Sequence, residues 1–399
     1  MSSSSKLRTL ILTLQYAHRA SYYDDWVAAY ANSEFFDCEV QNLFKISPDD
    51  FSSRVNECDL IILLHSATGD TLEYLAPLQQ TLADRNGPTL LSFLGNEFNS
   101  PYIKLSAKVA LLKDCRVDII ATQLLEEAGR YAYQHSGAKV VSIPHALNQT
   151  AFNSNRSYDD RKIDVGMRSY RYPPYLGDNE RNCIIDYFVE NERHLGLVQD
   201  ISTTKRFTPD KWSSFLGNCR SVLSTETGSW YLHPDDTLAE AVLDYAQHQR
   251  SGIMLNEDSK LRSFVKSPLM YALKKGPVKY GAFEDEKLDF EEVYERVYKN
   301  ASKSPVYTKA ISSRNFDAIG TRTCQIMFTG RYNDILVADE HYIPLNKDFS
   351  NIDEVVRKLR DKDLWRTIVD NAYEMVLEAH TYEHRALTTY NTVIEHSAA

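Results

Sequence analysis

The first 145 residues alternate between short apolar runs and polar, charged segments, and this alternation constrains the fold more than any other feature. Six runs have the length and composition of buried β-strands: Leu7–Leu14, Cys38–Phe44, Leu60–Leu64, Thr89–Phe93, Val117–Ala121 and Lys139–Ile143. Strands that alternate with helices form right-handed β-α-β units and a mostly parallel sheet covered on both faces. Ligands of such sheets bind at the carboxyl ends of the strands.

A second alternating region follows a polar stretch that ends near Asp160. It predicts strands at 162–166, His194–Val198, Ser221–Ser224, Thr323–Phe328 and His341–Leu345, with a helix at Asn179–Asn191. The charged residues between 231 and 305 predict helices at Leu238–Gln249, Ser259–Leu273 and Phe290–Tyr298. An amphipathic helical tail is predicted from Asn351 to His396, in which Asp361-Lys362-Asp363 is expected to cap a turn.

These patterns predict an α/β protein of two Rossmann-like domains. The first spans residues 1–148 and the second spans 160–380, with a helical insertion at about 230–305. Residues 381–399 are expected to form a carboxyl-terminal helix that packs back toward the first domain. A chain of 399 residues is long enough for two such domains.

Charge and cysteine content exclude several classes of protein. A net charge of −10 makes nonspecific binding of nucleic acid improbable, so we expect no nucleic-acid partner. Six scattered cysteines without a C-x-x-C pair argue against zinc and disulfides and favour reduced thiols. The chain has no apolar stretch of 18 residues and its amino-terminal apolar run is short, which predicts a cytoplasmic protein without a signal peptide. Peripheral contact with the inner face of a membrane stays open.

Several common catalytic motifs are missing. The sequence contains no G-x-x-x-x-G-K-[ST], no G-x-G-x-x-G after the first strand, no G-x-S-x-G and no H-E-x-x-H. Kinases, simple dehydrogenases, serine hydrolases and zinc proteases are therefore disfavoured, and no metal site is expected.

The strongest candidate site begins at Ser313. Arg314 and Asp317 are three residues apart on a predicted helix, next to a strand. The guanidinium can bind phosphate oxygens in a fork while the carboxylate accepts from sugar hydroxyls, which points to a nucleotide sugar. An exposed ion pair is the alternative interpretation. A helix amino terminus facing the site would favour phosphate.

Other polar groups follow strands of the second domain. Glu226, Thr227 and Gly228 come after the strand at 221–224, where a carboxylate suits sugar hydroxyls and a capped turn is the alternative. Further candidates for the diphosphate or for stacking are Arg168, Tyr170, Arg171 and Lys205. A basic surface loop is the alternative for these residues.

In the first domain, the loop after the first strand has the right position for an acceptor. Tyr16, Arg19 and Tyr22 are candidate acceptor-binding residues, and Glu97 occupies the equivalent place after the fourth strand. His18 is a candidate general base, as is Asp25 within Asp24-Asp25. A structural role is the alternative for His18.

The carboxyl-terminal third resembles the group 1, family-4-like glycosyltransferases of GT-B architecture. The resemblance rests on Ser313-Arg314-Asn315-Phe316-Asp317-Ala318, the apolar strand Gln325–Phe328, the short run Tyr342–Leu345 and the closing Thr381-Tyr382-Glu383-His384-Arg385. Weaker similarity extends to Ile143–Asn148 and to Ser224–Ser229. In that family the helix-start acid binds the donor ribose, and Asp317 occupies its position one methylene shorter. No acid lies among Tyr307 to Ile311, where the family places the first acid of its E-x7-E motif, and we expect Glu226 to supply it.

The resemblance implies a glycosyltransferase that moves a sugar from a nucleoside-diphosphate donor to a saccharide or lipid-linked acceptor. Retention of anomeric configuration, polysaccharide or surface-glycan biosynthesis, and no cofactor besides the donor substrate are implied as well. If the reaction inverts, His18 or Asp24/Asp25 would be the base. A nucleotide-sugar epimerase or phosphorylase on the same fold and a catalytically silent glycan-binding protein are the alternatives.

Overall fold

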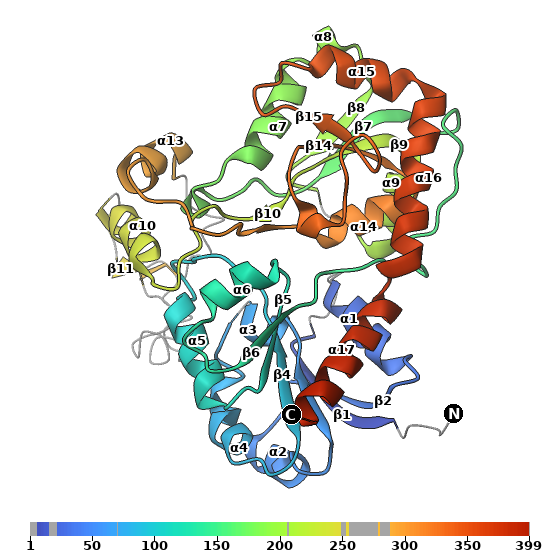
Figure 1. Ribbon diagram of the computed structural model, residues 1–399. Coiled ribbons are helices and arrows are strands. Elements are labelled where there is room, and N and C mark those ends of the chain that lie inside the picture. The colour runs from blue at the N-terminus through green and yellow to red at the C-terminus, as the bar shows by residue number, and fades with distance from the viewer. Residues whose placement is uncertain are drawn as a thin grey trace.

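The computed structural model describes residues 6–15, 22–69, 71–205, 207–248, 253–254, 278–279 and 288–398. Two α/β domains lie one above the other, and among the described residues the chain passes from one to the other between residues 142 and 163 and again between 379 and 382 (Figure 1). The predicted helix at 259–273 lies outside the described residues.

The amino-terminal domain is built on a six-stranded parallel sheet in the order β2-β1-β3-β4-β5-β6. All six predicted strands are confirmed, with these bounds: β1 Leu7–Thr13, β2 Phe36–Asn42, β3 Leu60–Leu63, β4 Thr89–Phe93, β5 Ile119–Thr122 and β6 Lys139–Ser142. The helices of this domain are α1 Tyr22–Ala31, α2 Pro48–Arg54, α3 Ser66–Gly69, η1 Ala76–Leu78, α4 Gln79–Ala83, α5 Leu105–Asp114 and α6 Glu126–Ala132. In β3, Ile61 and Leu63 pack into one core and Leu60 and Ile62 into another, as expected for a strand buried on both faces.

The carboxyl-terminal domain has a five-stranded parallel sheet in the order β15-β14-β9-β7-β8. Its strands are β7 Ile163–Arg168, β8 Gln199–Ser202, β9 Cys219–Ser224, β14 Cys324–Phe328 and β15 Ile343–Leu345. Its helices are η2 Pro174–Leu176, α7 Glu180–Glu190, α8 Glu192–Leu195, α9 Pro209–Asn218, α14 Ser313–Gly320, η5 Tyr332–Asp334, α15 Ile352–Arg360 and α16 Lys362–Ala379.

One predicted strand of this domain is wrong. The run His194–Val198 does not form a strand, because Gly196 adopts a left-handed conformation (φ 57°) and ends α8. The sheet strand β8 begins three residues later, at Gln199.

A two-stranded antiparallel ribbon leads into and out of the residues between 230 and 305. It pairs β10 Thr227–Gly228 with β13 Lys309–Ala310. The elements between these strands are α10 Thr237–His248, β11 Ile253–Met254, β12 Val278–Lys279, α13 Phe290–Val293 and the π-helical turn η4 Tyr294–Tyr298. Gly228 has a φ of 97°, and an added Cβ would lie 2.6 Å from the Thr308 carbonyl oxygen, so the ribbon requires glycine there.

The start of this segment reaches across to the amino-terminal domain. Asn99 donates to the carbonyl oxygens of His233 and Asp235 at 3.1 and 2.8 Å, and accepts from the His233 amide at 2.8 Å. Lys104 forms an ion pair with Glu240 at 2.7 Å. The segment therefore ties the two domains together on the side opposite the chain crossings (Figure 1).

The two chain crossings run side by side. The Leu147 amide donates to the His380 carbonyl, and the Tyr382 amide donates to the Leu147 carbonyl. Arg385 donates from Nε to the Pro144 carbonyl oxygen at 2.8 Å. The last helix, α17 Tyr382–Ser397, lies against the amino-terminal domain, where Tyr30 hydroxyl and Thr389 hydroxyl are 2.9 Å apart (Figure 1).

The predicted helical tail is divided into α15, α16 and α17. Asp361 accepts from the amides of Asp363 and Leu364 and caps α16, which confirms the expected capping role. Thr381 begins α17 in a capping box with His384.

Candidate active site between the two domains

A cavity of about 190 Å³ lies between the domains, at the carboxyl ends of both sets of strands. The amino-terminal domain contributes the loops after β4, β5 and β6, and the carboxyl-terminal domain contributes β10, β13, α7 and the start of α14. The lining residues are Asn96, Glu97, Phe98, Gln123, Leu124, His145, Arg181, Thr227, Gly228, Ala310, Ser312, Ser313 and Arg314. The position agrees with the general rule that open α/β sheets bind ligands at the carboxyl ends of their strands.

Two guanidinium groups face this cavity. Arg314 donates to Ser169 Oγ at 3.2 Å, and Arg181 donates to the Tyr172 hydroxyl at 2.9 Å while stacking over the Tyr172 ring. The described residues place no carboxylate within ion-pair distance of either group. Burial, together with the nearby Arg314 charge, lowers the pKa of Arg181 to about 10. Two neighbouring cations without an acidic partner make a strong site for an anion.

The start of α14 adds to this positive potential. Ser312 caps the helix through a capping box with Asn315, whose side chain is fixed by Ser224 and Gln325. Ser313 and Arg314 lie in the first turn and line the cavity. A helix amino terminus carries a partial positive charge and free amide groups, both of which favour phosphate.

A smaller space of about 20 Å³ adjoins this cavity and shares Arg181 and Arg314 with it. Arg168 and Ser169 line it from the end of β7. The Arg168 guanidinium is already neutralised by Asp200, at 2.7 Å, and stacks over the Phe215 ring. The predicted phosphate-binding arginine is therefore held in the wall by its own carboxylate partner.

Two acidic side chains, one from each domain, interact electrostatically, although neither is among the residues that line the two spaces. Asp317 accepts from Trp212 Nε1 at 2.8 Å, and Asp25 accepts from Asn148 Nδ2 at 2.6 Å. Loss of solvation, with a contribution from Asp25, raises the pKa of Asp317 to about 7. Loss of solvation, with a contribution from Asp24, raises the pKa of Asp25 to about 6. Both carboxyl groups thus titrate near neutral pH, as acid-base groups in active sites often do.

Glu226 is turned away from the interdomain cavity. Its two oxygens accept from the Tyr332 amide at 2.8 Å and from the Tyr307 hydroxyl at 2.5 Å. An added Cβ at Gly330 would meet the same carboxylate. Thr227 and Gly228 line the cavity, but Glu226 supports the loop after β14 instead.

Three further predicted donor residues lie outside both spaces. Arg171 pairs with Asp186 of α7 on the surface, with one contact of 2.9 Å. Tyr170 is 40% exposed and Lys205 is exposed. Neither they nor Arg171 line the two spaces between the domains. Tyr16, His18 and Arg19, and the side chain of Tyr22, lie outside the described residues.

The amino-terminal wall is mostly internally bonded. Glu97 accepts from Thr122, Tyr133 and the Gln123 amide, and burial raises its pKa. His145, after β6, is buried beside Trp26, and burial lowers its pKa to about 3. His145 is therefore neutral at physiological pH.

Sequence reasoning missed Arg181, Trp212 and His145. Arg181 carried a usable signal, because a basic residue in the first turn of a helix opposes the helix dipole. Trp212 and His145 gave none, since each looks like an ordinary apolar or strand-end residue until the chain is folded.

Residues 293–391 match a family model described as glycosyl transferase-like. Over 98% of its length, the chain is similar to Anabaena HepE, solved with UDP and glucose, at a TM-score of 0.51, with 10% identity and 100% of that chain covered. The chain is also similar to an alpha-glucosyltransferase solved with UDP-glucose and DNA containing an abasic site. The TM-score is 0.56 and the identity is 8%, with 98% of this chain and 100% of the other covered. For AviGT4, a glycosyltransferase involved in avilamycin A biosynthesis, the TM-score is 0.50 and the identity is 11%, with 98% of this chain and 99% of that chain covered. No curated protein matches the sequence.

The fold is therefore GT-B, with two Rossmann-like domains and a cleft between them. Residues 293–391, about a quarter of the chain, carry the similarity to the glycosyl transferase-like family. The matched segment contains α14, and with it Arg314 and Asp317.

Proposed function

We propose that this protein transfers a glycosyl unit from a nucleoside-diphosphate sugar, bound between the domains, to a hydroxyl group of a saccharide or lipid-linked acceptor. The observation that carries the proposal is the pair Arg181 of α7 and Arg314 at the start of α14, which face the interdomain cavity and have no carboxylate within ion-pair distance among the described residues. A diphosphate is the anion that would use two guanidinium groups and a helix amino terminus together.

The proposed position of the diphosphate also predicts a contact for another part of the nucleotide sugar. Asp317 lies one helical turn beyond Arg314 and would accept from the ribose hydroxyls of the donor. HepE and the alpha-glucosyltransferase were solved with UDP or UDP-glucose, which supports a nucleotide sugar as donor.

In the proposed reaction, the bond between the sugar anomeric carbon and the diphosphate oxygen breaks, and the nucleoside diphosphate leaves with the electron pair. The acceptor oxygen bonds to the anomeric carbon on the same face, and its proton passes to the leaving phosphate. Arg181 and Arg314 stabilise the charge that develops on that phosphate. We propose these arginines in place of a metal ion, and equal turnover with Mg²⁺ and with EDTA is the expected result.

Domain opening is part of the proposed cycle. A cavity of about 190 Å³ is smaller than the roughly 300 to 1,000 Å³ of most ligand sites. The donor would enter when the domains separate about the paired crossings at Leu147 and Thr381. Closure would then exclude water and limit donor hydrolysis.

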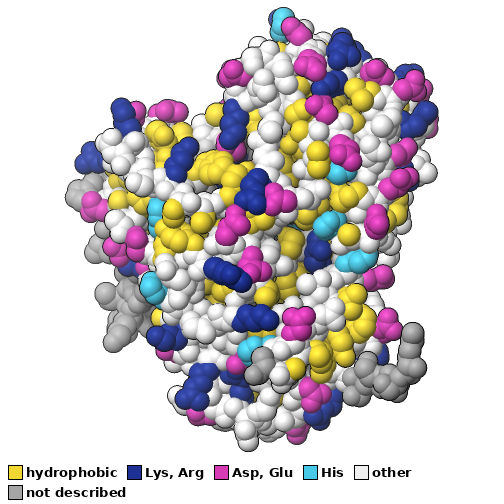
Figure 2. All heavy atoms as spheres, viewed as in Figure 1, with side chains coloured by type: hydrophobic (Ala, Val, Ile, Leu, Met, Phe, Trp, Pro, Cys, Tyr) yellow, Lys and Arg dark blue, Asp and Glu magenta, His cyan; other side chains and the backbone are white. Residues whose placement is uncertain are grey.

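A carbohydrate acceptor suits the surface better than DNA does. The net charge is −10, and the face drawn in Figure 2 mixes acidic and basic side chains over both domains, with no continuous basic stripe among its described residues. None of the described helices is long and apolar enough to cross a membrane. We propose polysaccharide or surface-glycan assembly in the cytoplasm as the setting.

Product analysis with a panel of UDP-, GDP- and dTDP-sugars tests the function. The expected result is release of a nucleoside diphosphate that depends on an added saccharide or lipid-linked acceptor, with the product retaining the anomeric configuration by NMR. Conversion of the donor without an acceptor would indicate an epimerase. Binding without turnover would indicate a silent glycan-binding protein, and transfer only to duplex DNA would contradict the proposed acceptor.

A further inference from the structure

A second cavity, of about 460 Å³, lies apart from the interdomain one, and the two share no lining residue. Their separation follows from the alternation of side chains along a strand. In β13, Ala310 lines the interdomain cavity, whereas Lys309 points the other way and meets Asp178 at 2.5 Å. The ribbon of β10 and β13 therefore forms a wall between the two cavities.

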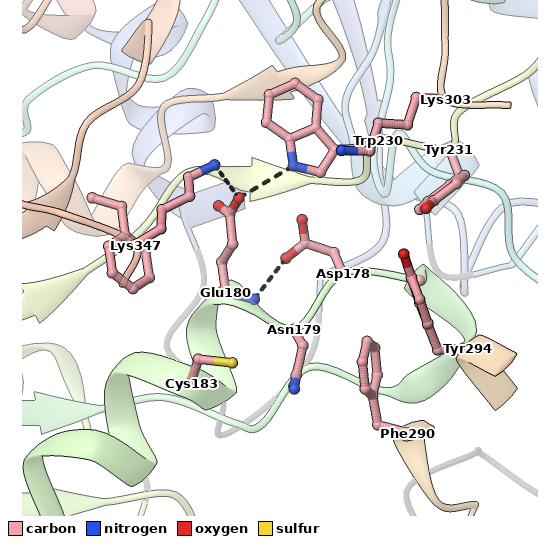
Figure 3. A pocket seen from close by; sticks show the side chains of 12 residues that line it. Asp178, Asn179, Glu180, Cys183, Trp230, Tyr231, Phe290, Tyr294, Lys303 and Lys347 are labelled. Carbon is pink, nitrogen blue, oxygen red and sulfur yellow. Dashed lines mark hydrogen bonds and ion pairs between the residues drawn. The ribbon is translucent and has the colours of Figure 1, made fainter. Parts of the chain in front are cut away.

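Aromatic side chains from two segments line this second cavity. Trp230 and Tyr231 follow β10, and Phe290 and Tyr294 come from α13 and η4 (Figure 3). The Glu180 carboxylate lies beside Trp230 in the same view, with the Asp178 carboxylate next to it. Aromatic rings facing a few convergent polar groups are typical of a site for a ring-shaped ligand that is apolar on its faces and polar at its edge.

The polar groups of the cavity are fixed before any ligand arrives. Glu180 accepts from Lys347 at 2.6 Å and from Trp230 Nε1 at 3.2 Å, and Lys309 lies 3.2 Å from its other oxygen. Nearby positive charges, chiefly that of Lys309, lower the pKa of Glu180 against the effect of burial. Glu180 therefore stays ionised and can accept hydrogen bonds from hydroxyl groups.

Two further groups can donate to a ligand. Asn179 carries an amide at the edge of the cavity, close to Phe290 in Figure 3. Lys303 lies over the Trp230 ring at 5.6 Å and has no carboxylate within ion-pair distance among the described residues. Hydrogen-bond donors and acceptors therefore lie beside the aromatic rings of this cavity.

We infer that this second cavity binds one pyranose unit of a glycan, at a distance from the unit that reacts. The faces of a pyranose ring carry C–H groups that pack on aromatic rings, and its edge carries hydroxyls that suit Glu180, Asn179 and Lys303. The segment between β10 and β13 would then anchor a long acceptor whose end reaches the interdomain cavity. Only the identification of the glycan as acceptor rests on the proposed function; the binding itself does not.

Cys183 provides a direct probe, because it lines this cavity and is exposed, whereas Cys38 and Cys58 are half-buried elsewhere. The rate of alkylation by N-ethylmaleimide is followed at each cysteine by mass spectrometry. The probes are maltohexaose, cellohexaose, chitohexaose and hexagalacturonate, each at about 10 mM, which would fill a site of millimolar affinity. At least one hexasaccharide is expected to slow alkylation of Cys183 by about tenfold, without changing that of Cys38 or Cys58.

Two variants keep the result specific. Phe290→Ala and Trp230→Leu should each remove the protection of Cys183, whereas Tyr170→Ala, on the exposed loop after β7, should keep it. Failure of all four hexasaccharides to protect Cys183 would overturn the inference. Protection of Cys183 in Phe290→Ala and Trp230→Leu equal to that in the wild type would overturn it as well.

The same assay separates this inference from the proposed function. UDP should leave Cys183 alkylation unchanged, and Arg314→Ala should keep the protection by hexasaccharide. Protection by UDP alone would overturn the inference, because the cavity would then belong to the donor site. Loss of UDP binding in Arg314→Ala, with hexasaccharide still protecting Cys183, would support both the proposed function and the second glycan site.

Discussion

The two walls of the interdomain cleft differ in how their charges are compensated. On the carboxyl-terminal wall, Arg181 and Arg314 have no carboxylate partner among the described residues. On the amino-terminal wall, Glu97 accepts three internal hydrogen bonds and His145 is buried and neutral. Uncompensated charge is costly to keep in a folded protein, so its presence on one wall only indicates where the charged ligand binds.

The substitution Arg181→Met, on the carboxyl-terminal wall, should have the largest effect on activity. Removing the guanidinium is expected to lower kcat/KM by about 1,000-fold, because a fixed donor to the leaving phosphate is lost. The free energy of unfolding should stay equal or rise, since Met keeps the packing over Tyr172 and removes a buried unpaired charge. Steady-state kinetics and urea unfolding of the same preparation measure the two quantities. A large loss of stability would instead assign Arg181 a structural role.

Asp25→Asn tests whether an acidic side chain of the amino-terminal domain acts as the general base. In the retaining reaction the leaving phosphate takes the acceptor proton, so kcat should fall by no more than about tenfold. A general base contributes about 100- to 10,000-fold, and a loss of that size would identify Asp25 as the base and predict inversion. Asp24→Asn, at the exposed neighbouring position, is the matched control.

Asp317 and Asp25 also predict how stability depends on pH. Their folded-state pKa values, about 7 and about 6, exceed the value of about 4 for an unfolded Asp, so the folded state binds more protons in this range. The free energy of unfolding without ligand should therefore decrease as pH rises from about 4 to about 7. Asp317→Asn should make this decrease shallower in urea titrations. An unchanged slope would show that Asp317 is ionised normally.

Asn99→Ala is expected to have the smallest effect. Asn99 ties the amino-terminal domain to the backbone of His233 and Asp235, so its loss should favour domain opening. Because each hydrogen bond contributes only about 1 kcal/mol, we expect a several-fold change in donor dissociation rate and little change in fold. Stopped-flow measurement of nucleotide release tests this. A release rate equal to that of the wild type would show that these contacts do not restrain the domains.

The sequence predicted the sheets well because buried strands have a local signature. The run Leu60–Leu64 became β3, with side chains packed on both faces. The error at His194–Val198 has a local cause too, because Gly196 ends a short helix inside an apolar run. Helix starts that depend on a capping side chain, such as Asp361 before α16, could also be predicted from the sequence.

The direction of side chains at the site could not be read from the sequence. Glu226 follows β9 as expected, but its carboxylate is drawn away by Tyr307 and Tyr332, which are far along the chain. Arg168 ends β7 as expected, yet Asp200 on the neighbouring strand neutralises it. Arg314 was found because a helix start, an arginine and an acid lie close together in sequence.

Calorimetry with UDP, GDP and dTDP tests most directly whether the cavity between the domains holds a nucleoside diphosphate. The wild-type protein should bind at least one of them, and Arg314→Ala should weaken that binding by about 100-fold, or about 2.7 kcal/mol. Arg171→Ala, which removes a surface guanidinium paired with Asp186, should leave the affinity unchanged. Equal affinity in wild type and Arg314→Ala, or a larger loss in Arg171→Ala, would contradict the assignment of this cavity as the donor site.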